Sequence, residues 1–181
     1  PTLIDGTVYI GSYDGNLYAV DAGSGEEQWR FETGSSINSS PTVVDETVYV
    51  GSGDNNLYAV SVESSEEEWR FETDNPVGSS PTVVDGTIFV GSSDNNLYAV
   101  STERGEGEWR FETAGSVHSS PTVAGGVVYI GSNDYNLYAI EAGVYGSSQG
   151  SRVSLETLGH YNNVTFEVGT PPMTSTLTKS A

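Results

Sequence analysis

The residues best suited to chemistry are four Asp-x-Asn triplets that recur along the chain. They occupy positions 14–16, 54–56, 94–96 and 134–136. Oxygen ligands at this spacing open the calcium-binding loop of an EF-hand, but that loop also needs a third ligand, a central Gly and a distal Glu. Each triplet here is followed instead by Leu-Tyr-Ala. Because Asp, Asn and Gly tolerate the positive φ of tight turns, the triplets favour hairpin turns over calcium sites.

Two other sets of residues are candidates for catalysis. Acidic residues gather at 26–27, 66–68 and 106–108, but they recur at one turn of every repeat, as a solvated surface does. His118 and His160 are the histidines of the chain, and neither has a second His nearby or any Cys to act with. A lone His is weak support for catalysis. The sequence therefore predicts no catalytic, cofactor-binding or metal-binding residue, and it favours a protein without enzymatic activity.

The charge of the chain excludes whole classes of partner. The 181 residues include 25 acidic and 6 basic ones, which gives a net charge of −19. Such a surface repels phosphate backbones, so nucleic acid is excluded as a partner. Many carboxylates with the single Lys179 are typical of proteins in concentrated salt, where screening weakens self-repulsion. An acidic secreted protein is the alternative. No apolar run is long enough for a membrane span, and Cys is absent.

An internal repeat of 40 residues decides the fold class. Pro1, Pro41, Pro81 and Pro121 each begin a copy, and every copy contains Gly-Ser and Asn-Leu-Tyr-Ala at fixed positions. Segments rich in β-branched and aromatic residues predict four strands in the second copy, at 41–44, 47–51, 56–60 and 68–73. Four strands per copy predict an all-β chain of β-propeller blades, each made of four antiparallel strands. A parallel β-solenoid is the alternative, but the hairpin turns favour antiparallel pairing.

One part of the repeat resembles a known family. Residues 19–29 read Ala-Val-Asp-Ala-Gly-Ser-Gly-Glu-Glu-Gln-Trp. This stretch is similar to the tryptophan-docking motif Ala-x-Asp-x-x-Thr-Gly-x-x-x-Trp of quinoprotein (PQQ-type) β-propeller repeats, and the resemblance extends to PQQ-repeat proteins of haloarchaea. It implies that Trp29, Trp69 and Trp109 pack between neighbouring blades, whereas Gln149 stands in place of Trp in the fourth copy.

The repeats divide the chain into three parts. Residues 1–140 hold PQQ-like repeats at 1–40, 41–80 and 81–120 and a partial one at 121–140; residues 141–169 form a divergent last-blade segment, and residues 170–181 form a flexible tail. Family propellers usually have seven or eight blades. About four blades therefore predict an incomplete, open arc. Unpaired edges at both ends of an arc favour self-association.

The resemblance implies two alternative functions. Some family members are dehydrogenases that bind PQQ and calcium on the propeller axis, using an Asp base, Glu and Asn ligands, a stacking Trp and often a vicinal Cys pair. This set has no match here, since Cys is absent and all three Trp stand at the docking position. Other members are scaffolds without a cofactor, such as an outer-membrane assembly lipoprotein. We expect a non-enzymatic scaffold that binds a protein or polymer, without cofactor; a fragment or remnant of a PQQ-dependent dehydrogenase is the alternative.

The segments that differ most among the copies are candidate interaction loops. They cover residues 34–38, 74–78 and 114–118. A rigid scaffold with varied loops is a common way to carry specificity, although loops free of constraint vary as well. We expect an extracellular or cell-surface location, with no signal peptide in this chain. The residues predicted to contact a partner are Ser36, Asn38, Asn75, Gly78, Ser116 and His118.

Overall fold

The computed structural model describes residues 1–143, and regular structure in this part of the chain consists of β-strands. Blade 1 contains β1 (Thr2–Ile4), β2 (Thr7–Gly11), β3 (Asn16–Asp21) and β4 (Glu27–Glu32). Blade 2 contains β5 (Thr42–Val44), β6 (Thr47–Gly51), β7 (Asn56–Ser61) and β8 (Glu67–Glu72). Blade 3 contains β9 (Thr82–Val84), β10 (Thr87–Gly91), β11 (Asn96–Ser101) and β12 (Gly107–Glu112). Blade 4 contains β13 (Thr122–Ala124), β14 (Val127–Gly131) and β15 (Leu137–Glu141).

The all-β prediction is confirmed, and the strands predicted in the second copy match β5–β8 to within a residue at each end. No helix that could cross a membrane lies within residues 1–143. The predicted flexible tail, 170–181, and the predicted divergent segment, 141–169, lie outside the described residues, apart from residues 141–143.

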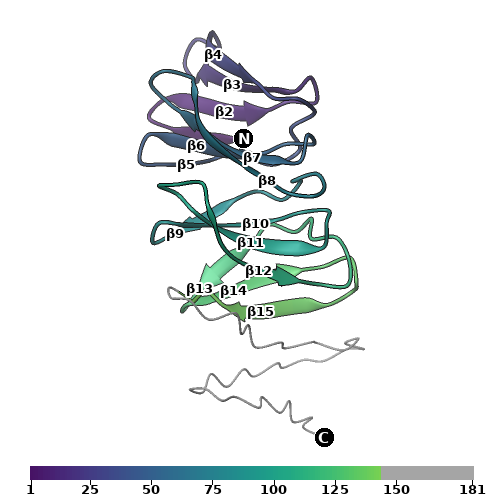
Figure 1. Ribbon diagram of the computed structural model, residues 1–181. Coiled ribbons are helices and arrows are strands. Elements are labelled where there is room, and N and C mark those ends of the chain that lie inside the picture. Colours follow the sequence, from purple (N-terminus) through teal and green to yellow (C-terminus); the bar gives the residue numbers. More distant parts are fainter. Residues whose placement is uncertain (144–181) are drawn as a thin grey trace, which may run out of the picture.

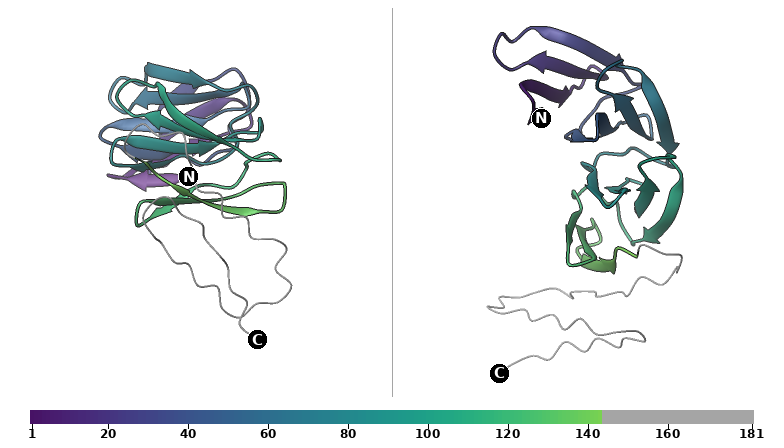
Figure 2. Two further views of the ribbon diagram at one scale, coloured as in Figure 1. Left: turned by 60° about the horizontal axis from the view of Figure 1, so that its bottom comes forward. Right: turned by 90° about the vertical axis from the view of Figure 1, so that its left-hand side faces the viewer.

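Each blade is its own antiparallel sheet, in which strands adjacent in sequence are adjacent in space. The first three sheets have four strands, and the fourth has three within the described residues. The first strands of successive blades are in contact, β1 with β5, β5 with β9 and β9 with β13. The blades therefore follow one another along a C-shaped arc with blades 1 and 4 at its ends (Figure 1, Figure 2). The open arc predicted from the number of repeats is confirmed.

The first hairpin of each blade closes through two residues with positive φ. In blade 2 these are Asp45 and Glu46, with φ of 48° and 65°. Two positive φ angles characterise the turn type whose twist matches that of antiparallel strands. Gly6, Gly86 and Gly126 occupy the second position in the other blades, because Gly adopts positive φ without a steric cost. Glu46 is the exception.

The hydrophobic core lies between neighbouring blades. Successive side chains of a strand point to opposite faces, so β6 directs Val48 and Val50 toward blade 1 and Tyr49 toward blade 3. Blade 1 covers the two valines with residues that include Leu17, which is fully buried. The same arrangement recurs between blades 2 and 3 and between blades 3 and 4. Blades 2 and 3 thus have both faces covered, and their second strands are buried along their whole length.

Candidate interaction surface

One end of every blade carries both kinds of loop that vary among the copies. The second hairpins, at 12–15, 52–55, 92–95 and 132–135, lie beside the linkers 34–38, 74–78 and 114–118. Backbone hydrogen bonds join the two sets. Val77 N donates to Ser52 O at 3.0 Å, and Ser93 N of the next blade donates to Pro76 O at 2.9 Å, with equivalent bonds at the other two linkers. We call this continuous band of hairpins and linkers the loop face.

A recurring Gly lets each linker pass close to the second strand of its blade. A Cβ on Gly51 would lie 2.5 Å from both the side chain and the carbonyl oxygen of Val77. Gly11 and Gly91 meet Ile37 and Val117 in the same way. In addition, Ser39 Oγ accepts from Gly51 N and donates to Gly51 O, at 2.8 and 2.9 Å. The Gly-Ser and Ser-Ser-Pro elements of the repeat therefore hold the linkers in place.

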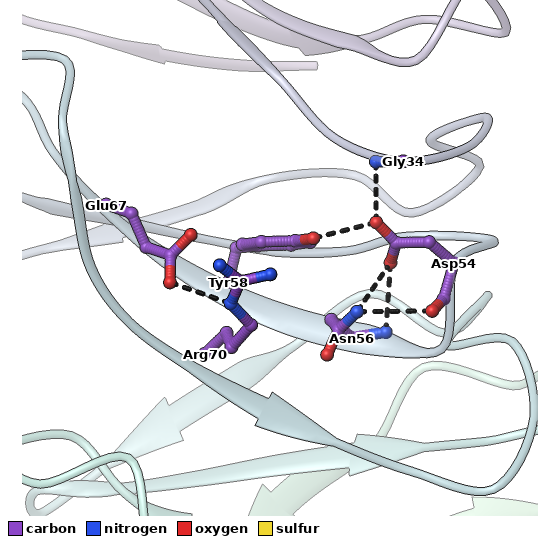
Figure 3. A network of polar contacts seen from close by, with 6 residues as sticks. All are labelled: Gly34, Asp54, Asn56, Tyr58, Glu67 and Arg70. Atoms are coloured by element: carbon purple, nitrogen blue, oxygen red, sulfur yellow. Dashed lines mark hydrogen bonds and ion pairs between the residues drawn. The ribbon is translucent and has the colours of Figure 1, made fainter.

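The Asp of each hairpin triplet fixes its own turn and, in blades 2 to 4, the linker before it. Asp54 Oδ1 accepts from the backbone and side-chain nitrogens of Asn56, each at 3.1 Å (Figure 3). Asp54 Oδ2 accepts from Tyr58 OH and from Gly34 N, both at 2.7 Å. The Asp residues of blades 3 and 4 accept the amides of residues 74 and 114 in the same way. The triplets thus lie in hairpin turns, with their carboxylates bonded to protein donors.

The same network sets the pKa values of these groups. Burial raises the pKa of Asp54, but the hydrogen bonds from Tyr58, Gly34 and Asn56 outweigh burial and leave the pKa below its usual value. The balance is the same for Asp134. Burial and the hydrogen bond to Asp54 raise the pKa of Tyr58 to about 12. Since a general base works best with a pKa near the ambient pH, these carboxylates are suited to structure and unsuited to proton transfer.

The structure places all six predicted loop residues on the loop face, in two kinds of surroundings. Asn38, Asn75 and His118 are exposed, and Ser36, Gly78 and Ser116 are half-buried. The ring of His118 and the side chain of Ser116 both contact Ser93 of the same blade: His118 Nε2 lies 3.0 Å from Ser93 Oγ, and Ser116 Oγ donates to Ser93 O at 3.1 Å. The three exposed residues are those with side chains available to a partner.

Two aromatic residues of the loop face stand at positions that vary among the copies but were not among the predicted contact residues. Tyr13 and Tyr135 project from the hairpins of blades 1 and 4, and their side chains are 84% and 96% exposed. The other copies have Gly, Ser or Asn at these two turn positions. A large aromatic residue at the tip of a hairpin was therefore the signal that the repeat alignment contained.

At the opposite end of the arc's blades, blades 1, 2 and 3 each contact the following blade through a Trp. Trp29 Nε1 donates to Val62 O at 3.1 Å, and Trp69 Nε1 donates to Thr102 O at 2.9 Å. The ring of Trp69 covers Gly105, where a Cβ would lie 2.5 Å from the indole and where φ is +64°. At Gly105 the indole of the preceding blade leaves no room for a Cβ, whereas blade 2 has Ser65 at this position with a φ of 58°. Trp109 packs against the core between blades 3 and 4.

The repeat also matches a known family. A family model described as outer membrane protein assembly factor BamB matches residues 1–78 and 66–144. The two matches overlap and together span all four blades. The chain belongs to this family of PQQ-type β-propeller repeats. Among proteins with curated annotation, none matches the sequence.

Solved structures of BamB and of designed proteins have the same arrangement of blades. BamB from Moraxella catarrhalis has a TM-score of 0.67 and 22% identity, over 75% of this chain and 46% of that one. The computationally designed Ika8 has a TM-score of 0.70 and 15% identity, over 77% of this chain and 44% of its own. For the designed Ika4 the values are 0.69 and 14%, over 76% and 86%. The chain thus spans less than half the length of BamB and Ika8, and the likeness shows the fold.

The residues of the described chain do not fit PQQ with calcium. Residues 1–143 contain no group of three or more His, Asp or Glu side chains placed to hold a metal ion. The hairpin carboxylates accept hydrogen bonds from backbone and Tyr donors, as Asp54 does. Trp29 and Trp69 are held between blades by hydrogen bonds from their Nε1 atoms to the carbonyl oxygens of Val62 and Thr102. The described residues thus show no cluster of calcium ligands, and two of the three Trp rings are engaged between blades.

Proposed function

We propose that this chain is a non-enzymatic β-propeller repeat module that binds a protein or polymer partner through the loop face. The observation that carries the proposal is the contrast between the backbone and the side chains of that face. The backbone is fixed by the same hydrogen bonds in every repeat, whereas the exposed side chains differ from copy to copy. A rigid frame that presents varied side chains is suited to specific recognition.

The distribution of charge favours the loop face over the opposite end of the blades. That opposite end carries exposed carboxylates at its turns, including Glu46, Glu63 and Glu103. On the loop face, Tyr13 and Tyr135 are exposed together with Asn38, Asn75 and His118. The exposed carboxylates of its hairpins and linkers are Asp14 and Asp74, while the other hairpin Asp residues are half-buried. Interface centres are depleted of charged residues and enriched in Tyr. The loop face therefore has the composition of a binding surface.

The proposal includes an extracellular or cell-surface location in a salty medium. The family description names an outer membrane protein, which supports a surface location. The net charge of −19 supports a medium in which salt screens repulsion within the chain. We also propose that residues 1–140 form the PQQ-like repeat part of the chain, with residues 141–169 as a divergent last-blade segment and residues 170–181 as a tail.

Binding by two matched variants tests the role of the loop face. One variant carries Asn75→Ala, His118→Ala and Tyr135→Ala, and the control carries Glu63→Ala, Glu103→Ala and Glu106→Ala at the opposite end. Immobilised wild type and both variants are exposed to the secreted and cell-envelope fractions of the source organism, and the bound material is identified by mass spectrometry. We expect one species that the wild type and the control retain and the loop variant loses. Equal retention by both variants would contradict the proposal.

A second measurement separates the scaffold from the alternative of a dehydrogenase remnant. PQQ and calcium are added together, and absorbance and the melting temperature are recorded. Saturable binding with a raised melting temperature would favour the dehydrogenase remnant, since a ligand that binds the folded state stabilises it. We expect no change in either signal.

A further inference from the structure

The two ends of the arc expose apolar surface that inner blades bury. Within residues 1–143, the large hydrophobic side chains that are exposed on strands all belong to the end blades, and they are Leu3, Ile10 and Leu137. Ile10 is 39% exposed, whereas Val50 and Val90 at the same repeat position are fully buried. Leu137 is 42% exposed, whereas its equivalents Leu57 and Leu97 are fully buried. Within residues 1–143, the sheets of blades 1 and 4 therefore each have one face that no described blade covers.

These two faces are opposite halves of one kind of interface. Inside the chain, the Leu of one blade shares a core cluster with the Val or Ile of the next, and the pairs are Leu17 with Val50, Leu57 with Val90 and Leu97 with Ile130. The next pair in this series is Leu137 with Ile10. Blades 1 and 4, which carry them, lie at opposite ends of the arc (Figure 2), so one copy cannot form the pair, but two copies can.

A ladder of hydrogen bonds along the first strands has the same continuation. Thr2 Oγ1 donates to Pro41 O, Thr42 Oγ1 donates to Pro81 O and Thr82 Oγ1 donates to Pro121 O, each across one repeat. Thr122 is the next donor of the series, and it is exposed where Thr42 and Thr82 are half-buried. The acceptor that continues the ladder is the carbonyl oxygen of Pro1 in a second copy.

We propose that the occupant of each bare face is a second copy of this chain, with blade 4 of one copy against blade 1 of the other. The arrangement continues an interface that the chain already forms three times. A head-to-tail contact either closes or propagates into a filament. Closure by two copies agrees with the size of solved propellers of this fold, because one copy matches 46% of the BamB chain and 44% of the Ika8 chain. The contact uses the end faces and leaves the loop face free, so it is independent of the proposed function.

Association of the two copies depends on salt. Each copy carries a net charge of −19, and repulsion between like-charged copies is screened as the Debye length falls from about 10 Å at 0.1 M salt to about 3 Å at 1 M. The test therefore measures the mass of the full chain by light scattering and sedimentation, once at low salt and once in molar KCl. We expect a shift from a single copy of 19.2 kDa toward twice that mass in molar KCl.

Three variants test where the copies meet. Ile10→Asp and Leu137→Asp each place a charge on one bare face, and Tyr135→Asp adds the same charge to the exposed tip of a hairpin. All three sites are exposed in the single copy, so the variants should fold, which circular dichroism checks. We expect the first two variants to weaken association more than about a hundredfold, since a charge buried without a partner is costly. Tyr135→Asp should associate like the wild type.

Mixing and cross-linking identify the geometry. An equal mixture of Ile10→Asp and Leu137→Asp retains one unaltered interface and should recover part of the double mass. Because the chain has no Cys, the variant carrying both Ile10→Cys and Leu137→Cys should form covalent dimers on oxidation. A single-copy mass at every salt concentration would overturn the proposal. The proposal would also be overturned if the Leu137→Asp variant associated as strongly as the wild type. A measured mass that exceeded that of two copies as the protein concentration rose would overturn it as well.

Discussion

At the scale of single residues, Asp54 shows how the family repeat uses a carboxylate. Its two oxygens accept four hydrogen bonds from Asn56, Tyr58 and Gly34, and the last of these donors belongs to the preceding linker. One side chain thus closes a hairpin and joins two blades. The equivalent Asp14 of blade 1 accepts from Asn16 N and Tyr18 OH. The bond to the preceding linker therefore distinguishes the hairpins of blades 2 to 4 from that of blade 1.

Stability should fall in acid because of these carboxylates. The pKa values of Asp14, Asp21, Asp54 and Asp134 are lower in the folded chain than their ordinary value. Groups with a lowered pKa contribute stability above the unfolded pKa of about 3.9 and lose it as the pH falls through the folded pKa. We expect the free energy of unfolding, measured with urea, to decrease from about pH 5 downward.

The variant Asp54→Asn tests the origin of that pH dependence. It removes one titrating group and the charge that strengthens four hydrogen bonds, so it should cost about 1–3 kcal/mol at pH 7. Its stability should fall less steeply in acid than that of the wild type. Equal slopes for both proteins below pH 5 would contradict the role given to Asp54.

Glu46 occupies a turn position with positive φ at which the other three copies have Gly. Its φ is 65°, and this left-handed backbone conformation costs a non-Gly residue about 1–2 kcal/mol of conformational free energy. Glu46→Gly should therefore raise the free energy of unfolding by about 0.5–1 kcal/mol, after the entropy that Gly adds to the unfolded chain. Glu63→Gly is the control, because it removes the same charge from an exposed turn position whose φ is not positive. The control should gain nothing.

At the scale of elements, the docked Trp ties the outer strand of one blade to a turn of the next. Trp69 stands opposite the small, fully buried Ala59 across the pair of β7 and β8, and its indole reaches Thr102 O and Gly105 in blade 3. Both contacts cross a blade boundary. The outer strands thus contribute to the stability of the arc, although their alternate residues, such as Arg70, are exposed.

Two substitutions separate the parts of this contact. Trp69→Ala removes the ring and should cost about 3–5 kcal/mol of unfolding free energy, as for other large aromatic residues. Trp69→Phe retains most of the apolar contact but loses the hydrogen bond to Thr102 O. It should lower the free energy of unfolding by about 1 kcal/mol for the lost bond, in addition to the cost of the smaller ring. Chemical denaturation measures both. Small and equal losses would show that the indole does not join the blades.

At the scale of the whole molecule, charge sets the conditions under which the arc is stable. The chain has a net charge of −19 over 181 residues, so its carboxylates repel one another at low ionic strength and destabilise the folded state. We expect the melting temperature to be higher in molar KCl than in dilute buffer, because salt shortens the Debye length from about 10 Å to about 3 Å. The Ile10→Asp variant should show the same rise, which separates screening within one chain from association. A melting temperature independent of salt would contradict the proposed salty medium.

The sequence by itself determined the elements of this protein. A strict period of 40 residues, alternation of apolar and polar side chains, and turn residues at fixed positions predicted the strands of blade 2 to within a residue. These signals are local, since a strand depends on its own alternation and a hairpin on a few turn residues. The three Trp residues were assigned to contacts between blades only through the family resemblance.

The tertiary structure alone decided which surfaces are used and which are bare. Asp54 looks the same as Asp14 in sequence, but only Asp54 receives the amide of a preceding linker. Leu137 carries the same motif as Leu57, yet it is exposed because no described blade follows it. Such differences depend on the position of one blade relative to another, and burial is a property of neighbours that lie tens of residues away. A repeated sequence therefore specifies each blade, while its place in the arc determines what each face can bind.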